Sequence, residues 1–352
     1  HHLKRRGIVL VGTKIGIDLG SSNTRVFVEG KGLVFAEPSV VVCDAHSGAP
    51  VAFGKEAAEM FGRTPGSLSV VAPMKSGAVS DYALTKHLLF YFIEKICKHK
   101  YFKPNVVVSM HGGLSKLEKR TILDVVYASG AAKAFFLDEP FAAAMGAGVP
   151  FREAAGNVVA DIGGGTADVA VISMGRIAES RSIRTAGNAL TEAIVQFLLR
   201  LHDVEVGFLT AQEIKHSIGG AALHSPEIAV VMNGKHRKTA TPLSFEVNSK
   251  EIYRAMQEPL EQLAEGIHAL IEKSPPEFMA DIADRGILLT GGGANLYGID
   301  SYLRRKLSLP VRVAENPAEC VINGVGLALK QLEKLLHNGS IYDIESLRDY
   351  AE

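Results

Sequence analysis

The sequence predicts an α/β protein built from two similar lobes, and three observations lead to that fold class. The chain has 352 residues, which is enough for two domains of ordinary size. The segment Ile17–Glu37 recurs without a gap at Ala160–Ser180. At Ala134–Gly148 and Gly286–Leu307, an apolar strand pattern leads through a short turn into a helical pattern.

The composition is that of a soluble globular protein, with 47% hydrophobic and 22% charged residues. Lys+Arg and Asp+Glu both number 38, so the sequence predicts no basic field for binding nucleic acid. No apolar run approaches the roughly 20 residues of a membrane-spanning helix. The three cysteines form no CxxC pair, which disfavours a zinc site or a disulfide framework and fits a reducing cytoplasm.

Each copy of the repeat predicts a strand, a tight turn, a second strand, another turn and a third strand. Asp18 and Asp161 end the first strands, and the turns that follow are Gly20–Asn23 and Gly163–Thr166. Glycines allow a backbone to approach an anion closely, and an adjacent aspartate can hold a divalent cation through water. One such hairpin is more simply an ordinary glycine-rich turn. Two at matched register predict two like domains that clamp a polyphosphate and its metal ion.

A third glycine cluster, Gly291–Gly293, lies between a predicted strand and a predicted helix, as in many nucleotide cradles. It matches neither GxGxxG nor GxxxxGK[ST], so the Rossmann and P-loop folds are not indicated. The alternative is a plain strand-to-helix connection. Leu209–Gly220 predicts a helix whose polar residues Gln212, Glu213 and Lys215 would ordinarily be solvated.

Two acids, Asp138 and Glu139, lie between a predicted strand and a helix that starts at a proline. They would complement the helix dipole in the simpler interpretation. Alternatively, an acid at a strand end beside a phosphate clamp would orient an attacking water molecule. The residues alone leave both interpretations open.

Together these motifs resemble those of the actin-type ATPase superfamily. "GIDLGSSNT" and "VVADIGGGTADVAVIS" resemble its two phosphate motifs, and "LTGGGANL" resembles its adenosine motif. "GKGLVFAEPSVVV", "DEPFAAAMGAGVP" and "SPPEFMADIADRGILLTGGG" are similar to segments of MreB-type bacterial actins, in the same order. The resemblance implies an actin-like fold, in which two RNase H-like lobes surround a central nucleotide cleft and each lobe carries a smaller subdomain.

The expected lobe boundaries follow from this resemblance. Lobe I comprises residues 12–142 and 321–345, with a small subdomain at about 32–75. Lobe II comprises residues 143–320, with a small subdomain at about 188–250. Expected elements include helices at Tyr82–His99 and Asn323–His337, and a helix interrupted near Pro259.

The resemblance also implies roles for individual residues. Glu139 would orient the lytic water, with Thr166 assisting, and Asp18 and Asp161 would hold hydrated Mg²⁺. The residues expected to contact ATP, with GTP as an open alternative, are Ser21, Ser22, Asn23, Gly163, Gly164 and Gly165 at the phosphates, and Gln212, Glu213, Ile214, Lys215, Gly291, Gly292, Gly293, Ala294 and Asn295 at the ribose and adenine.

The chain departs from the family pattern at several positions. Ser21-Ser22-Asn23 replaces Thr-Ala-Asn, Ala167 replaces a threonine, Ala186-Gly187-Asn188 replaces Gly-Gly-Asp, and Gln212 replaces a glutamate. These differences indicate a divergent paralogue. They bear on the hydrolysis rate and nucleotide choice more than on the fold.

Partners and location are also implied by the resemblance. Tyr101 and Phe102, flanked by lysines, fall where the family has a membrane-inserting loop and suit an anionic lipid surface. Alternatively, Phe102 packs in the core and the lysines are solvated. We expect a cytoplasmic protein, peripheral on the inner face of the cell membrane, that associates with itself as a filament and with cell-wall synthesis or membrane adaptor proteins.

The sequence therefore predicts a slow, polymerising ATPase of the bacterial actin type that organises cell shape. A second hypothesis is a small-molecule kinase of the same superfamily, which would transfer phosphate to a sugar or acid. A third is a nucleotide-binding scaffold with little hydrolysis. Glu139 and Thr166 argue against the scaffold, whereas the changes at Ala167 and Asn188 favour it.

Overall fold

The computed structural model describes residues 12–60, 66–75, 78–97 and 103–348, and the chain divides into two compact units. Unit 1 comprises His1–Ala155, Ile172–Ala178 and Glu319–Glu352, and unit 2 comprises Gly156–Val171 and Glu179–Ala318. Each unit has its own hydrophobic core. The lobe boundaries expected from the sequence stay a prediction.

Unit 1 is built on a five-stranded sheet in the order β10-β9-β1-β2-β3. The first three strands form an antiparallel meander: β1 (Lys14–Leu19), β2 (Asn23–Val28) and β3 (Gly32–Pro38). Strand β9 (Asn105–Met110) pairs with β1 in parallel, and β10 (Lys133–Asp138) pairs in parallel with β9. The β9 and β10 residues are almost all buried, as expected for parallel strands covered on both faces.

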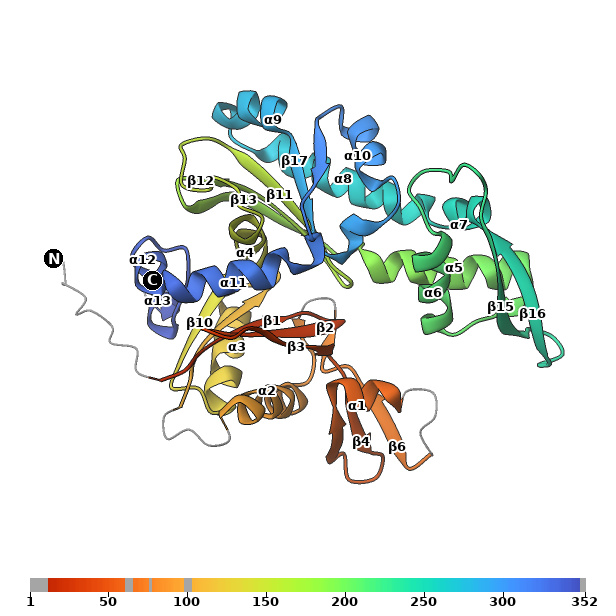
Figure 1. Cartoon of the computed structure of the whole chain (residues 1–352), viewed down its shortest axis with the longest axis horizontal. Helices are drawn as coiled ribbons and strands as arrows, with labels where there is room; N and C mark the ends of the chain where they lie inside the picture. Colours follow the sequence, from red (N-terminus) through yellow and green to blue (C-terminus); the bar gives the residue numbers. More distant parts are fainter. Residues whose placement is uncertain (1–11, 61–65, 76–77, 98–102, 349–352) are drawn as a thin grey trace. The chain divides into compact units, whose positions relative to one another are not determined.

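Helices cover both faces of this sheet (Figure 1). Helices α2 (Tyr82–Cys97) and α3 (Lys116–Ala128) lie on one face, and α4 (Glu139–Gly146) and α11 (Cys320–Lys330) lie on the other. Helix α3 begins with a capping box in which Ser115 and Glu118 satisfy each other's backbone amides. The predicted helix Tyr82–His99 corresponds to α2, and it is confirmed up to Cys97, where the described residues end.

The predicted helix Asn323–His337 is wrong in one respect, because it is divided in two. Helix α11 ends at Lys330 and α12 occupies Leu332–His337. Gln331 between them leaves helical geometry, with φ −122° and ψ 18°, and its N–H donates to the Ala328 carbonyl three residues back. The last described element is a short helix, α13 (Ile344–Arg348).

A smaller sheet of unit 1 has the order β5-β4-β6. It consists of β4 (Val41–Asp44), β5 (Pro50–Phe53) and β6 (Leu68–Val71), with α1 (Gly54–Glu59) packed on it. Val42, Ala52 and Ala57 form its own small core. A two-stranded ribbon of β7 (Met74–Lys75) and β8 (Ala78–Val79) follows.

Unit 2 repeats the five-stranded arrangement of unit 1. Its sheet has the order β13-β12-β11-β17-β18. The strands are β11 (Asn157–Ile162), β12 (Ala167–Ser173), β13 (Arg176–Ile183), β17 (Ile287–Thr290) and β18 (Val311–Val313). The end of β12, the start of β13 and the turn between them, Ile172–Ala178, are the part of this sheet that is assigned to unit 1. Strands β11, β12 and β13 are the sequence counterparts of β1, β2 and β3, and they hold the same places in the sheet. The duplication predicted from the sequence is thus confirmed at the level of topology.

Three helices pack on the five-stranded sheet of unit 2: α8 (Gln257–Lys273), α9 (Met279–Arg285) and α10 (Ile299–Leu307). Pro259 lies in the first turn of α8, where a missing N–H costs nothing, and the break before it separates α8 from α7 (Ser249–Ala255). The interruption expected near Pro259 is confirmed.

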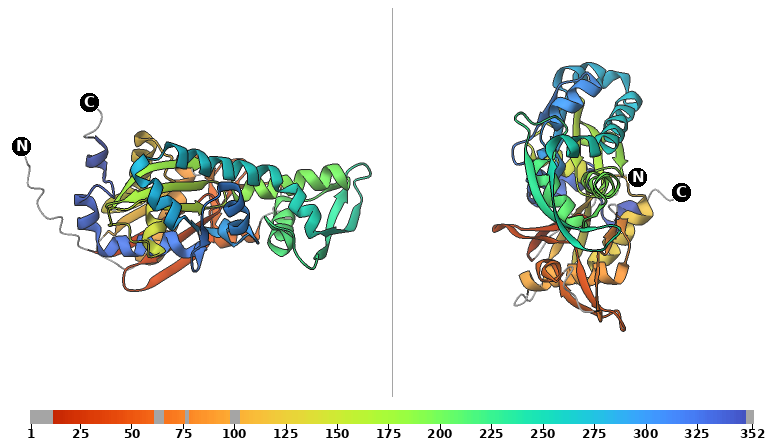
Figure 2. Two further views of the ribbon diagram at one scale, coloured as in Figure 1. Left: turned by 90° about the horizontal axis from the view of Figure 1, so that it is seen from above. Right: turned by 90° about the vertical axis from the view of Figure 1, so that its right-hand side faces the viewer.

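A second part of unit 2 carries a three-stranded sheet in the order β14-β15-β16. Its strands are β14 (Val204–Glu205), β15 (Ala229–His236) and β16 (Pro242–Asn248), and they pack with α5 (Gly187–Leu201), α6 (Phe208–Ile218) and α7. Figure 2 shows this sheet and its helices at the end of unit 2 remote from the five-stranded sheet. The two parts share one continuous core.

Glycines allow helices α4 and α11 to cross at very short range within unit 1. A Cβ atom at Gly324 would lie 1.8 Å from the Ala142 carbonyl oxygen, and one at Gly146 would lie 1.8 Å from the Cys320 carbonyl oxygen. A Cβ at Gly16 of β1 would lie 2.4 Å from Val325. Helix α11 therefore lies directly on both the sheet and α4, which fixes the helix that begins at Glu139.

Gly324→Ala should lower the free energy of unfolding by about 1–3 kcal/mol, because the new methyl group meets main-chain atoms that cannot rotate away. Urea unfolding measures this change. The control is Gly207→Ala, where a Cβ atom would meet nothing within 4 Å. Equal unfolding midpoints for the two variants would contradict the packing described for α4 and α11.

Candidate functional site

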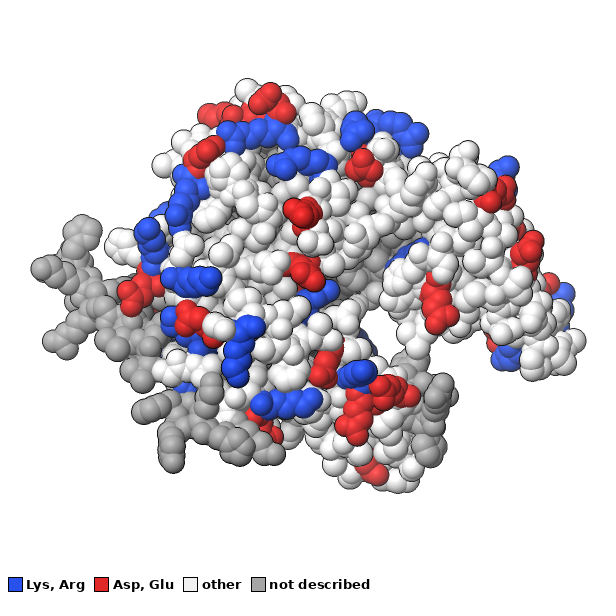
Figure 3. Space-filling model, viewed as in Figure 1, with Lys and Arg blue, Asp and Glu red and all other residues white. Residues whose placement is uncertain are grey.

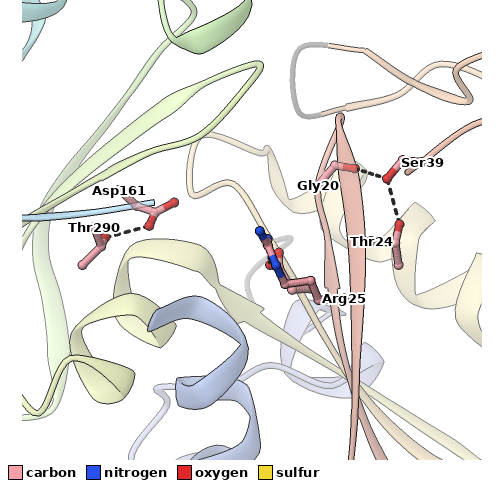
Figure 4. Close-up of polar contacts among 7 residues, drawn as sticks. Gly20, Thr24, Arg25, Ser39, Asp161 and Thr290 are labelled. Carbon is pink, nitrogen blue, oxygen red and sulfur yellow. Dashed lines mark hydrogen bonds and ion pairs between the residues drawn. The ribbon is translucent and has the colours of Figure 1, made fainter. Parts of the chain in front are cut away.

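In unit 1, a buried serine holds the turn between β1 and β2. The turn is closed by the Gly20 N–H, which donates to the Asn23 carbonyl at 3.2 Å. Ser39, which is fully buried, donates its hydroxyl to the Gly20 carbonyl at 2.6 Å and accepts from Thr24 Oγ1 at 2.8 Å (Figure 4). Ser22 and Asn23 are exposed at the tip, so the side chains predicted to contact phosphate project from a fixed backbone.

Asp18 lies at the end of β1, directly opposite Arg25 of β2 in the strand register. The guanidinium Nη1 donates to Asp18 Oδ2 at 3.2 Å, and only 4% of the Asp18 side chain is exposed. Burial raises the pKa of Asp18 to about 6, while the positive charge of Arg25 acts in the opposite direction. The predicted metal ligand is thus already neutralised in part by a cation from its own sheet.

The two acids of the predicted hydrolytic motif have different surroundings. Asp138 ends β10 and is buried, and its Oδ1 lies 2.5 Å from Lys119 Nζ. Burial raises the pKa of the Asp138 carboxyl, and Lys119 opposes this rise. Glu139 is the first residue of α4 and is half-buried. The carboxylate of Asp138 is therefore held by Lys119 inside the protein, whereas Glu139 is in part accessible to solvent.

In unit 2, the turn between β11 and β12 repeats the turn of unit 1. The Gly163 N–H donates to the Thr166 carbonyl at 2.9 Å, which is the counterpart of the bond from Gly20 to Asn23. Thr166 Oγ1 donates to Asp168 Oδ2 at 2.9 Å, so the lone pairs of that hydroxyl remain able to accept a hydrogen bond. Both side chains are buried.

Asp161 at the end of β11 is fixed by a neighbouring strand. Its partner in the β11–β17 register is Thr290, whose hydroxyl donates to Asp161 Oδ1 at 2.6 Å (Figure 4). Asp161 is 3% exposed and Thr290 is fully buried. The second predicted metal ligand therefore has a set orientation.

The start of helix α5 packs against the glycine turn of unit 2. The Gly187 and Asn188 N–H groups donate to the carbonyls of Gly163 and Gly164, at 3.1 and 2.7 Å. A Cβ atom at Gly187 would lie 3.1 Å from the Gly163 carbonyl oxygen, so glycine at this position allows the close approach. Lys215 of α6 joins this group, because its Nζ donates to the Gly187 carbonyl at 2.8 Å.

Lys215 also donates to Thr191 Oγ1 at 2.8 Å. Burial lowers the pKa of Lys215 to about 8, because the charged ammonium is partly removed from water. Its Nζ lies 3.7 Å from the position of a Cβ atom at Gly187. The structure thus places a titratable cation beside the Gly163–Gly165 turn.

The third glycine cluster lies against the same strand end. Gly291 has φ +81°, and a Cβ atom there would lie 2.4 Å from the Ile162 carbonyl oxygen. A Cβ atom at Gly293 would lie 2.3 Å from the Ile162 side chain. Residues Gly292–Asn295 form a short 3₁₀ helix, and Gly292 and Asn295 are exposed. The predicted strand, turn and helix are confirmed, with Ile162 as the surface on which the turn rests.

Within unit 2, the structure brings together three predicted groups: Gly163–Gly165, Gly291–Gly293 and Lys215. Two predicted contacts are available only through the main chain, because the side chains of Ile214 and Ala294 are buried. Gln212 is half-buried and Glu213 is exposed on the same helix. In unit 1, Asp18 and Ser21–Asn23 belong to one hairpin. Tyr101 and Phe102 lie outside the described residues.

Sequence reasoning missed several residues that shape these turns. Ser39, Arg25, Thr290, Asp168 and Lys119 each donate to or accept from a predicted site residue or its backbone. The sequence signal was weak but present for two of them. Thr290 ends a predicted strand immediately before the glycines, and Arg25 is a charged residue in an apolar strand.

Among the described residues, no group of three or more His, Cys, Asp or Glu side chains has the arrangement of a metal site. None of the helices in the described ranges is both long and apolar enough to cross a bilayer. On the face drawn in Figure 3, acidic and basic side chains are interspersed.

Comparison with known proteins identifies close relatives. The family model described as MreB/Mbl protein matches residues 12–337. The chain is 39% identical over 337 residues to the cell shape-determining protein MreB of Escherichia coli K12, covering 94% of this chain and 96% of the relative.

Solved structures agree with this match. The crystal structure of MreB5 of Spiroplasma citri bound to ADP superposes with a TM-score of 0.88 at 30% identity, covering 93% of this chain and 99% of that one. MreB5 bound to AMPPNP gives a TM-score of 0.86 at 30% identity, covering 93% and 98%. The actin-like fold implied by the sequence motifs is confirmed.

Ser39→Ala should lower the free energy of unfolding by about 1–3 kcal/mol, because the partly buried Gly20 carbonyl loses its hydrogen-bond donor. Chemical denaturation measures the difference. Ser244→Ala is the matched control, since Ser244 is exposed and its hydroxyl donates to the exposed Asn233 side chain. If Ser39→Ala is no less stable than this control, Ser39 does not hold the turn.

Proposed function

Because the chain belongs to the MreB/Mbl family, we propose that it is an actin-like ATPase that binds Mg-ATP, polymerises, and organises cell shape or cell-wall synthesis. One observation carries the proposal. In both units, an aspartate near the end of a strand is followed by a tight glycine turn. Each turn is closed by an equivalent hydrogen bond, from the Gly20 N–H to the Asn23 carbonyl and from the Gly163 N–H to the Thr166 carbonyl. A fold that duplicates an anion-binding turn is suited to a polyphosphate.

Nucleotide binding is supported by the hydrogen-bonding groups and the glycines at these turns. Ser21–Asn23 and Gly163–Gly165 would contact the phosphates, and the cationic Lys215 beside Gly187 would add positive potential. Gln212–Lys215 and Gly291–Asn295 would contact ribose and adenine, with Ile214 and Ala294 contributing main-chain atoms only. MreB5, at 30% identity, was solved with ADP and with AMPPNP.

The donor set fits a hydrated magnesium ion rather than an ion held in a protein cage. Asp18 and Asp161 would hold it through water, and among the described residues no three or more His, Cys, Asp or Glu side chains are grouped as a direct metal site requires. The orientation of Asp161 by Thr290 suits such an outer contact. When bound, the ion would neutralise charge on the β- and γ-phosphates. Asp18 would share its charge between the hydrated ion and Arg25.

Hydrolysis is assigned to Glu139, with help from Thr166. Glu139 would accept a hydrogen bond from the attacking water, and the Thr166 oxygen, whose proton is donated to Asp168, would accept another. Family membership does not favour the small-molecule kinase. The scaffold with little hydrolysis differs from this proposal only in turnover.

The proposal also includes filament formation and attachment to the membrane. Self-association would be head to tail, as in a heterologous contact that continues without closure. Tyr101 and Phe102 would contact anionic lipid of the inner membrane face, with cell-wall synthesis or adaptor proteins as further partners. A filament would multiply one weak lipid contact into firm attachment.

Sedimentation tests the whole proposal. With Mg-ATP and vesicles containing anionic lipid, the protein should pellet above a critical concentration, and much less should pellet without nucleotide or with neutral vesicles. Electron microscopy of the pellet should show filaments on the lipid. A protein that stays in the supernatant at every concentration, with and without lipid, contradicts the proposed function.

Glu139→Gln should reduce ATP turnover by roughly 10²–10⁴-fold, because the amide cannot act as a base. Nucleotide affinity should stay close to that of the unchanged protein, as measured with a fluorescent ATP analogue. The control is Glu272→Gln, an exposed acid on α8. Unchanged turnover in Glu139→Gln would remove that residue from the mechanism and favour the scaffold.

ATP affinity should depend on pH through Lys215. With a pKa of about 8, this side chain is cationic below that pH and neutral above it. Affinity should therefore be highest near neutral pH and fall by roughly tenfold as pH rises through 8, if the phosphates favour the charged form by about one pKa unit. Lys215→Met should bind more weakly near neutral pH and show no such fall. A titration with the same slope in both proteins would exclude Lys215 as the cause.

A further inference from the structure

Lys119 holds the residue that precedes Glu139 in a buried ion pair. Its Nζ lies 2.5 Å from Asp138 Oδ1, and the two side chains are only 12% and 6% exposed. Asp138 is the N-cap residue of α4, yet its side chain makes no capping hydrogen bond. The carboxylate is thus turned away from the helix that it precedes and toward α3, which carries Lys119.

Two aromatic rings enclose the same ammonium group. Lys119 Nζ lies 4.9 Å from the ring centroid of Phe136 and 4.9 Å from that of Tyr342. Both distances are within the range of about 6 Å at which a ring face attracts a cation. Phe136 belongs to β10, two residues before Asp138, whereas Tyr342 belongs to the segment after α12. The ammonium is therefore held by groups from β10 and from the C-terminal part of the chain.

The segment that supplies Tyr342 is itself fastened to β10. The Phe136 N–H donates to the Tyr342 carbonyl at 2.7 Å, and the Tyr342 N–H donates to the Phe136 carbonyl at 2.9 Å. Ile341 is 1% exposed. The hydroxyl of Ser340 donates to the Gly175 carbonyl at 2.6 Å. This segment, Ser340–Tyr342, thus adds an isolated bridge to the edge of the strand that ends in Asp138.

We propose that Lys119 is a positioning residue for ATP hydrolysis and that Ser340–Tyr342 acts on hydrolysis through it. Lys119 fixes Asp138, and the main chain of Asp138 leads directly into Glu139, so the ion pair sets where the Glu139 carboxylate lies. Tyr342 completes the enclosure of Lys119, so release of Ser340–Tyr342 from β10 loosens the ion pair and slows turnover. The inference rests on the proposed function, in which Glu139 orients the attacking water.

The effect should appear in turnover rather than in nucleotide binding. Displacing a catalytic group by about 1 Å is enough to cost on the order of 10²-fold in rate. Lys119→Met should therefore lower kcat on the order of 10- to 100-fold, while KM and the nucleotide Kd change by about twofold or less. Lys119→Arg, which keeps the charge and the hydrogen bonds, should retain most of the turnover.

A second variant separates positioning from folding, because Lys119→Met leaves a buried carboxylate without its cation. The double variant Lys119→Met with Asp138→Asn replaces the ion pair by neutral side chains of similar shape. We expect its melting temperature to return toward that of the unchanged protein and its kcat to stay low. Full turnover in the double variant, or failure of Lys119→Arg to rescue, would overturn the positioning role.

The contribution of the C-terminal segment is tested at Tyr342. Tyr342→Phe keeps the ring beside Lys119 and should retain most of the turnover, whereas Tyr342→Leu removes the ring and should lower kcat roughly threefold. Equal kcat values for the two variants would overturn the role of this segment.

Glu139→Gln, assayed in parallel, tells the two proposals apart. If Glu139→Gln is inactive and the double variant is fully active, only the positioning role fails. If Glu139→Gln has full turnover, the catalytic assignment of Glu139 fails, and the positioning role fails with it.

Discussion

The structure depends on one backbone hydrogen bond that is made twice. In each unit, the first strand of a meander ends, and the N–H of a glycine donates to the carbonyl three residues later. A Cβ atom at Gly20 or Gly163 would crowd that carbonyl, at 2.8 and 3.0 Å. The glycines therefore keep the turn tight, and the tight turn lets β2 and β12 start immediately beside the acid that ends the preceding strand.

The surroundings of each turn show how differently one motif can be supported. In unit 1, a buried serine hydroxyl holds the turn carbonyl and an arginine neutralises the acid. In unit 2, the start of α5 donates to the turn carbonyls, and a threonine from the neighbouring parallel strand orients the acid. The shared element is main-chain geometry, whereas the charges differ. Asp18 faces a permanent cation, and Lys215 beside the other turn carries a charge that burial has made titratable.

The two neighbouring acids of the proposed hydrolytic motif also have different surroundings. Asp138 and Glu139 are adjacent acids at the junction of β10 and α4, but only Asp138 is buried against a lysine. Removing a carboxylate from water is costly unless a cation accompanies it. The carboxylate of Asp138 thus belongs to the internal support of the β10–α4 junction, and the proposed mechanism uses Glu139. Helix α4, which begins at Glu139, is also held by its close crossing with α11 at Gly146 and Gly324.

The sequence by itself determined the duplicated α/β architecture, the two acid-headed turns and the strand-to-helix connections at Asp138 and Gly291. These features depend on local patterns, namely glycine spacing, strand alternation and helix start signals, which are legible without knowing what lies nearby. The tertiary structure alone decided which partners the key groups have. Ser39 reaches Gly20 across the sheet, Thr290 meets Asp161 through parallel pairing, and Lys119 meets Asp138 from a separate helix. Such contacts join residues far apart in sequence, so no local period encodes them. The break at Gln331 is a local feature that the sequence did not reveal, because its amide bonds the carbonyl three residues back in a stretch whose composition favours a continuous helix.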